Sequence, residues 1–181
     1  MSGLLALCAD LFGAPPQAVR RAILHPNDLV LGALFLWGVL SQLISQGVLD
    51  HGFALGGSSA LLGALLAAAL IALGASALFH LMAGLLGAEG RAAHLLRLFA
   101  LVFFLNALLP PFALLGGTVW WLARLAVAGW QLALLVIGVR EIYAVNTGTA
   151  LAIVATPPAV LIVVVPTLGL ITVGIGLLHL F

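Results

Sequence analysis

The chain has 181 residues, of which 65% are hydrophobic and 6% are charged, and its formal net charge at pH 7 is +1. A soluble domain carries about 25% charged residues, so this composition, with a mean hydropathy of +1.34, excludes a soluble domain held by a membrane anchor. All six cationic residues are arginines, and only two of them are adjacent. Nucleic acid is excluded as a partner, because phosphate binding needs clustered cations. The composition predicts an integral membrane protein that contacts the lipid bilayer directly.

The N-terminal segment, residues 1–25, is too short and too polar to cross a bilayer. Apolar side chains recur at helical spacing over residues 3–12, and the Pro15-Pro16 pair ends this helix because proline lacks an amide hydrogen. Arg20 and Arg21 follow in a second short segment with apolar neighbours. The pattern predicts an amphipathic helical segment that lies at the membrane surface.

Apolar stretches separated by short polar connections fill residues 26–181. Most of them are close to the roughly 20 residues that cross the hydrocarbon core as a helix. The second stretch is rich in alanine, leucine and glycine, and because small side chains let helices approach closely in lipid, we expect it inside the bundle. The predicted fold class is an all-α polytopic transmembrane bundle with five spans, at about residues 29–44, 60–83, 95–115, 118–139 and 149–180.

The last apolar stretch, residues 149–181, is longer than one span and shorter than two spans with a turn. Pro157, Pro158 and Pro166 interrupt it. We interpret it as one kinked span, and a span followed by a re-entrant segment stays open as the alternative.

The arginines outside the spans predict the orientation. Arg20 and Arg21 precede the first span, Arg91 and Arg97 flank the connection between the second and third, and Arg140 follows the fourth. The other connections contain no cationic residue. The positive-inside rule therefore predicts a cytoplasmic N-terminus, and five spans place the C-terminus outside.

Three polar residues within the spans are candidate functional residues: Arg124, Asn106 and Gln131. A charge at the centre of a membrane helix costs roughly 2.5–3.5 kcal/mol, so an interaction that offsets this cost is expected for Arg124. It either extends past Trp120 and Trp121 to the outer headgroups, or it is a buried cation that faces Asn106, Gln131 or a substrate anion. For Asn106 and Gln131 we favour hydrogen bonds to neighbouring helices over substrate binding.

His80, near the inner end of the second span, could form a proton or metal site with His25 and His94. No two histidines are three or four residues apart, so we favour an interfacial histidine and predict no metal and no cofactor. A phosphate loop, a dinucleotide fingerprint and a nucleophile elbow are also missing from the sequence, so we predict that the protein is not an enzyme.

Two proline pairs are candidate helix breaks, because proline frees backbone carbonyls that must find another partner at membrane depth. Broken helices of this kind occur in transporters, and ordinary kinks give the same pattern. The four residues are Pro110, Pro111, Pro157 and Pro158.

The sequence from Trp130 to Tyr143, followed by Asn-Thr-Gly-Thr-Ala at residues 146–150, resembles the Yip family of Ypt-interacting proteins. The Leu-Gly-Ala-Glu-Gly connection at residues 86–90 and the arginine-bearing segment before the first span resemble that family too. The resemblance implies a five-span bundle with a cytoplasmic N-terminus. It also implies a cytoplasmic family motif formed by Gly138, Arg140 and Glu141.

In eukaryotic members the family resemblance implies binding to Rab-type GTPases and related membrane proteins in vesicle traffic. The abundance of alanine, leucine and arginine without lysine resembles a GC-rich bacterial protein, so we expect a bacterial member in the inner (plasma) membrane. We expect a non-enzymatic protein that acts by association with itself or other membrane components, in membrane organisation or a trafficking-like role. The alternative is a small transporter or channel for an ion, small solute or lipid that uses polar groups in spans three to five.

Overall fold

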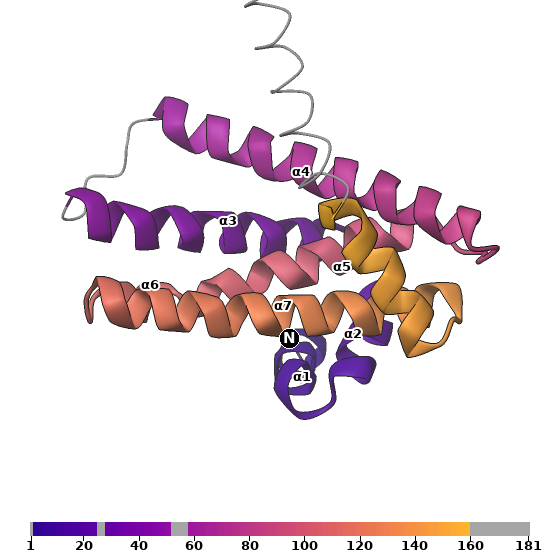
Figure 1. Cartoon of the computed structure of the whole chain (residues 1–181). Helices are drawn as coiled ribbons and strands as arrows, with labels where there is room; N and C mark the ends of the chain where they lie inside the picture. Colours follow the sequence, from indigo (N-terminus) through magenta and orange to yellow (C-terminus); the bar gives the residue numbers. More distant parts are fainter. Residues whose placement is uncertain (1, 25–27, 52–57, 160–181) are drawn as a thin grey trace, which may run out of the picture.

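The computed structural model describes residues 2–24, 28–51 and 58–159, and every regular element in these ranges is helical. The all-α prediction is therefore confirmed for this part of the chain. Figure 1 shows the long helices lying side by side, with two short helices packed beneath them. In chain order the elements are α1 (Ser2–Gly13), α2 (Pro15–Ile23), α3 (Asp28–His51), α4 (Ser58–Leu85), α5 (Ala92–Phe104), the 3₁₀ helix η1 (Leu105–Leu108), α6 (Pro110–Ala113) and α7 (Gly117–Tyr143).

Four segments in the described ranges are long and apolar enough to cross a membrane as helices: Asp28–Gly47, Leu61–Leu85, Ala92–Ala113 and Gly117–Tyr143. The protein is thus an integral membrane protein with four candidate spans. The fifth predicted span begins in a helix over residues 147–159. Its remainder lies outside the described residues.

The short helix α2 is amphipathic and packs against α5 and α7. Its apolar side chains, among them Val19 and Ile23, are buried, whereas Arg20 and Arg21 are exposed. Pro15 is tolerated at the start of this helix because the first turn has no hydrogen-bond acceptor for its missing amide hydrogen. One face of α2 therefore helps to attach the N-terminal segment to the bundle.

The centre of the described bundle is α5 with its continuation through η1 and α6. Within an apolar 18-residue stretch of each span, half of the residues are buried in this span, compared with 33% in the α3 span, 22% in the α7 span and 17% in the α4 span. A row of large side chains at helical spacing points into the core: Leu95, Leu98, Leu101, Leu105 and Leu109.

The prediction that the second span lies inside the bundle is wrong for the described part of the chain. Its helix, α4, is the most exposed of the four candidate spans. Small side chains allow a close approach, but lipid tails are as apolar as leucine, so burying an alanine-rich helix gains little. The large side chains of α5 make more dispersion contacts with their neighbours, and this favours α5 at the centre.

Two glycines allow helix backbones to meet at the core. A Cβ atom added at Gly38 of α3 would overlap the backbone carbonyl group of Phe103 in α5. One added at Gly138 of α7 would overlap the side chain of Leu98 in α5. Both close contacts involve α5, which is consistent with its central position.

The third span is interrupted before the first proline pair. The α-helix ends at Phe104, η1 follows, and α6 begins at Pro110. Because Pro110 has no amide hydrogen, the carbonyl of Asn106 instead accepts from the amide of Leu109, at 3.0 Å. The second pair behaves differently, because the helix over residues 147–159 continues through Pro157 and Pro158.

Candidate functional site

The interruption of the third span is linked to α7 by Gln131. Its Nε2 atom donates to the carbonyl oxygen of Val102 at 3.0 Å and to Oδ1 of Asn106 at 3.1 Å. Asn106 is buried and lies in η1, where the α-helical hydrogen-bond ladder changes. The structure thus brings two of the predicted candidates together, in an arrangement that joins two helices.

Arg124 lies apart from this pair and has a partner that the sequence did not indicate. Its Nη1 atom donates to Oε1 of Gln42 on α3 at 2.7 Å. Its guanidinium carbon lies 5.4 Å from the centre of the Trp120 ring, which is close enough for a cation–π interaction. The alternative in which Arg124 faces Asn106 or Gln131 therefore has no support among the contacts of the described residues. The only sequence signal that pointed to Gln42 as a partner was its uncharged polar side chain near the end of the first predicted span.

An ion pair joins the N-terminal segment to the end of α7, where Gly138, Arg140 and Glu141 lie. Arg20 Nε donates a hydrogen bond to Oε2 of Glu141 at 2.8 Å, and Arg140 Nη2 lies 3.4 Å from Oε1 of the same carboxylate. The carboxylate side chain is 15% exposed, whereas Arg20 is largely exposed and Arg140 is partly exposed. Exposed ion pairs contribute little to stability, so the Arg20–Glu141 pair mainly fixes where α2 docks. Gly138 serves the contact with Leu98 described above.

His80 pairs with a tyrosine that the sequence did not single out. Its Nδ1 atom lies 2.8 Å from the hydroxyl of Tyr143, and the ring centres are 6.0 Å apart. A Cβ atom at Gly90 would overlap the Tyr143 ring, so this glycine makes room for the tyrosine. His25 lies outside the described residues. Within the described ranges, no three His, Cys, Asp or Glu side chains gather as metal ligands.

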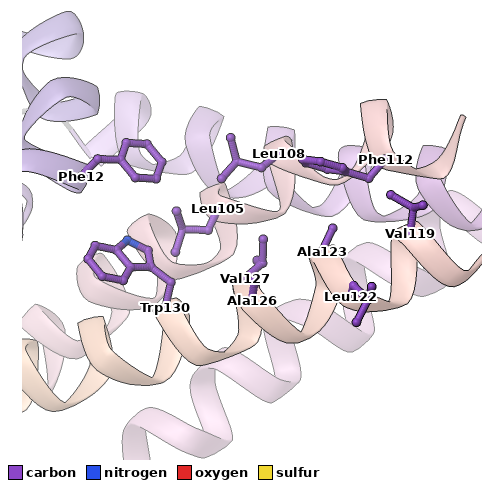
Figure 2. A pocket seen from close by; sticks show the side chains of 10 residues that line it. All are labelled: Phe12, Leu105, Leu108, Phe112, Val119, Leu122, Ala123, Ala126, Val127 and Trp130. Carbon is purple, nitrogen blue, oxygen red and sulfur yellow. The ribbon is translucent and has the colours of Figure 1, made fainter. Parts of the chain in front are cut away.

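An apolar cleft of about 490 Å³ runs along α7 (Figure 2). At one end Phe12 of α1 stacks on Trp130, with ring centres 6.5 Å apart and planes 8° apart. Figure 2 shows the side chains of η1, α6 and α7 forming the rest of the wall, and none of them is charged. Such a lining suits hydrocarbon, and it offers no charged group to a polar substrate.

The outer surface of α4 carries a regular row of residues that we call the α4 seam. The row follows the alternating four- and three-residue spacing of a heptad repeat, in which every third or fourth position faces the same side. All of its members are exposed, and a Cβ atom added at any of its three glycines would meet nothing within 4 Å. The α4 seam consists of Gly63, Ala67, Leu70, Gly74, Ala77, Leu81 and Gly84.

Comparison with protein families matched the chain to the model described as the Yip1 domain, over residues 9–168. Neither the curated proteins nor the solved structures gave a match. The matched range includes the four candidate spans, the α4 seam and the ion pairs of Glu141.

Proposed function

The chain belongs to the Yip1 domain family, whose members are generally non-enzymatic, trafficking-related membrane proteins, and from this premise we propose that it acts by lateral association with a second copy of itself. The α4 seam is the surface that we assign to this association. We propose a role in organising the membrane or its traffic, without catalysis. The sequence-based orientation, with a cytoplasmic N-terminus and five spans, belongs to the same proposal.

The single observation that carries the proposal is the spacing of small residues on an exposed helix. A heptad row keeps the same side of two helices in contact along their length. Glycine and alanine at most positions of that row let the two backbones approach closely, and close approach is the main source of attraction between helices in lipid. The α4 seam combines both features along most of α4.

Contact with lipid alone does not explain why glycine occupies these positions of the α4 seam. A glycine inside a helix costs about 1 kcal/mol relative to alanine, and lipid-facing positions accept any apolar side chain. Gly63 and Gly74 lie inside α4, and neither is needed for a contact within the described chain. A partner helix that packs against them would offset this cost through close backbone contact.

The alternative function, transport through polar groups in spans three to five, receives less support. Asn106 and Gln131 bond each other, and Arg124 bonds Gln42 and stacks on Trp120. These contacts are the expected behaviour of polar side chains that hold membrane helices together.

The proposed orientation is supported by ion pairs at one end of the bundle. Arg20 of α2 reaches Glu141 at the end of α7, and Arg97 near the start of α5 reaches Asp28 at the start of α3. These contacts gather the cationic segments at one end, as a single cytoplasmic side requires. We assign residues 1–25 to the surface segment and 26–181 to the bundle, in a bacterial inner membrane.

The test is the oligomeric state in vesicles of phosphatidylethanolamine and phosphatidylglycerol, measured by counting photobleaching steps of singly labelled protein. We expect dimers for the wild type and monomers for Gly74→Leu, because a leucine there separates the two backbones. Gly129→Leu on α7 is the matched control, since Gly129 is also exposed with open space around its Cα. Monomeric wild-type protein at every protein-to-lipid ratio would contradict the proposal, as would dimers of Gly74→Leu.

A further inference from the structure

A groove of about 380 Å³ lies between α3, α4 and α5, and none of its lining residues belongs to the α4 seam. Small side chains make room for it, because Gly32, Ala69 and Ala100 stand where larger residues would close it. Ala72, another lining residue, is nine positions from Leu81 of the seam, or about two and a half helical turns, so the two project from opposite sides of α4.

The groove is accessible from the lipid side. Gly32, Leu73 and Leu96 line it, and all three are exposed. Its volume lies within the range of roughly 300–1,000 Å³ found for small-molecule sites. On the α3 side its wall is apolar from Leu31 to Phe35, a stretch of about one helical turn. A hydrocarbon chain is the occupant that such walls favour in a bilayer.

The end of the groove carries opposite charges that are fixed side by side. Arg97 Nη2 lies 3.0 Å from Oδ1 of Asp28, and its Nη1 donates to the carbonyl of Ile23 at 2.6 Å. The guanidinium group has five N–H donors, so these two bonds do not exhaust it. The side chain of Asp28 is 74% exposed, which leaves its carboxylate accessible to a further cation.

We propose that this groove is a binding site for phosphatidylethanolamine. One acyl chain lies along the apolar walls, the phosphate accepts hydrogen bonds from Arg97, and the ammonium group donates to Asp28. An anionic headgroup without the ammonium would match Arg97 but would leave Asp28 facing a like charge. The charge pair at the end of the groove therefore selects a zwitterionic headgroup with N–H donors.

The lipid site goes beyond the proposed association and does not depend on it. The two surfaces share no residue, although Leu73 of the groove lies beside the seam, so each can fail while the other holds. Gly32→Leu fills the groove and leaves the α4 seam unchanged, whereas Gly74→Leu alters the seam and leaves the groove lining unchanged. Photobleaching measures association through the α4 seam, and lipid retention measures binding in the groove.

The first test is native mass spectrometry of full-length protein extracted from vesicles that contain equal amounts of phosphatidylethanolamine and phosphatidylglycerol. We expect one phosphatidylethanolamine per wild-type chain, and about tenfold less retention for Gly32→Leu. A Cβ atom at Gly32 meets nothing within 4 Å, so the leucine can enter the groove without displacing the backbone. Gly129→Leu, remote from the groove, should retain lipid as the wild type does. A wild type that retains no lipid, as when protein fills the groove, would overturn the proposal, as would equal retention by Gly32→Leu.

The second test asks whether a substitution at Asp28 changes which lipid headgroup the groove retains. Asp28→Asn removes the negative charge at an exposed position while keeping a side chain that can cap α3. We expect retention to shift from phosphatidylethanolamine toward phosphatidylglycerol by about tenfold in their ratio. A wild type that prefers phosphatidylglycerol, or an Asp28→Asn variant with an unchanged ratio, would overturn the assigned headgroup.

Discussion

The neighbouring helices α4 and α5 are both apolar enough to span a membrane, yet the chain uses them in opposite ways. About half of the α5 span is buried and supplies a row of leucines to the core, whereas most of the α4 span is exposed and its small residues line an outer surface. In water, the more apolar helix would be drawn inward. In lipid that drive is absent, so position depends on how well side chains interlock. The comparison shows that a high content of small residues does not place a membrane helix inside the bundle of its own chain.

Replacing glycine with alanine should change the free energy of unfolding in opposite directions at the α5 contact and on α4. This is the largest effect that we expect. Gly38→Ala places a Cβ atom against the Phe103 backbone and forces α3 away from α5, at a cost of about 3 kcal/mol. Gly74→Ala on α4 has open space and should stabilise the monomer by up to about 1 kcal/mol. Unfolding free energies of monomeric protein, measured by reversible unfolding in mixed micelles, check both. Equal effects would remove the distinction between the helices.

Leucine truncation sharpens the same contrast. Leu101→Ala in α5 should destabilise the protein by about 2 kcal/mol, because Leu101 is 1% exposed and its removal leaves a cavity. Leu66→Ala in α4 should change stability by less than about 0.5 kcal/mol, because Leu66 is 57% exposed. The same unfolding measurement applies. A loss for Leu66→Ala as large as that for Leu101→Ala would show that α4 is packed within the monomer.

The smallest effect concerns the link from α7 to the interrupted part of the central span. Gln131→Leu removes the donor to Val102 and Asn106 and should cost about 1 kcal/mol. Leu132→Ala, at the adjacent exposed position, is the control and should be close to neutral. If Gln131→Leu is as stable as the wild type, the hydrogen bonds do not hold the helices together, and a role in solute binding regains support.

Much of the helical order follows from local sequence. Proline pairs separate α1 from α2 and mark the start of α6, and apolar runs locate the four candidate spans. These features depend on the missing amide hydrogen of proline and on the thickness of the bilayer, both of which act on short stretches of chain.

Contacts between helices were harder to predict. The sequence presented Asn106 and Gln131 as polar residues without identifying them as a pair, and it gave no reason to join Arg124 to Gln42. The placement of α4 was predicted wrongly for the same reason. In lipid, several rotations of an apolar helix have similar energies, and only the shape and hydrogen bonds of the assembled bundle decide among them.

Disulfide cross-linking along α4 in native membranes tests the central claim, that the α4 seam joins two copies of the chain. Cys8 is the only cysteine, so Cys8→Ser gives a clean background for single cysteines. We expect Leu70→Cys and Leu81→Cys, on the seam, to form disulfide-linked dimers upon oxidation. Ile71→Cys and Leu73→Cys, which are exposed on either flank of the seam, should remain monomeric. Cross-linking at the flanks equal to that at the seam, or no dimer at any of the four positions, would contradict the account.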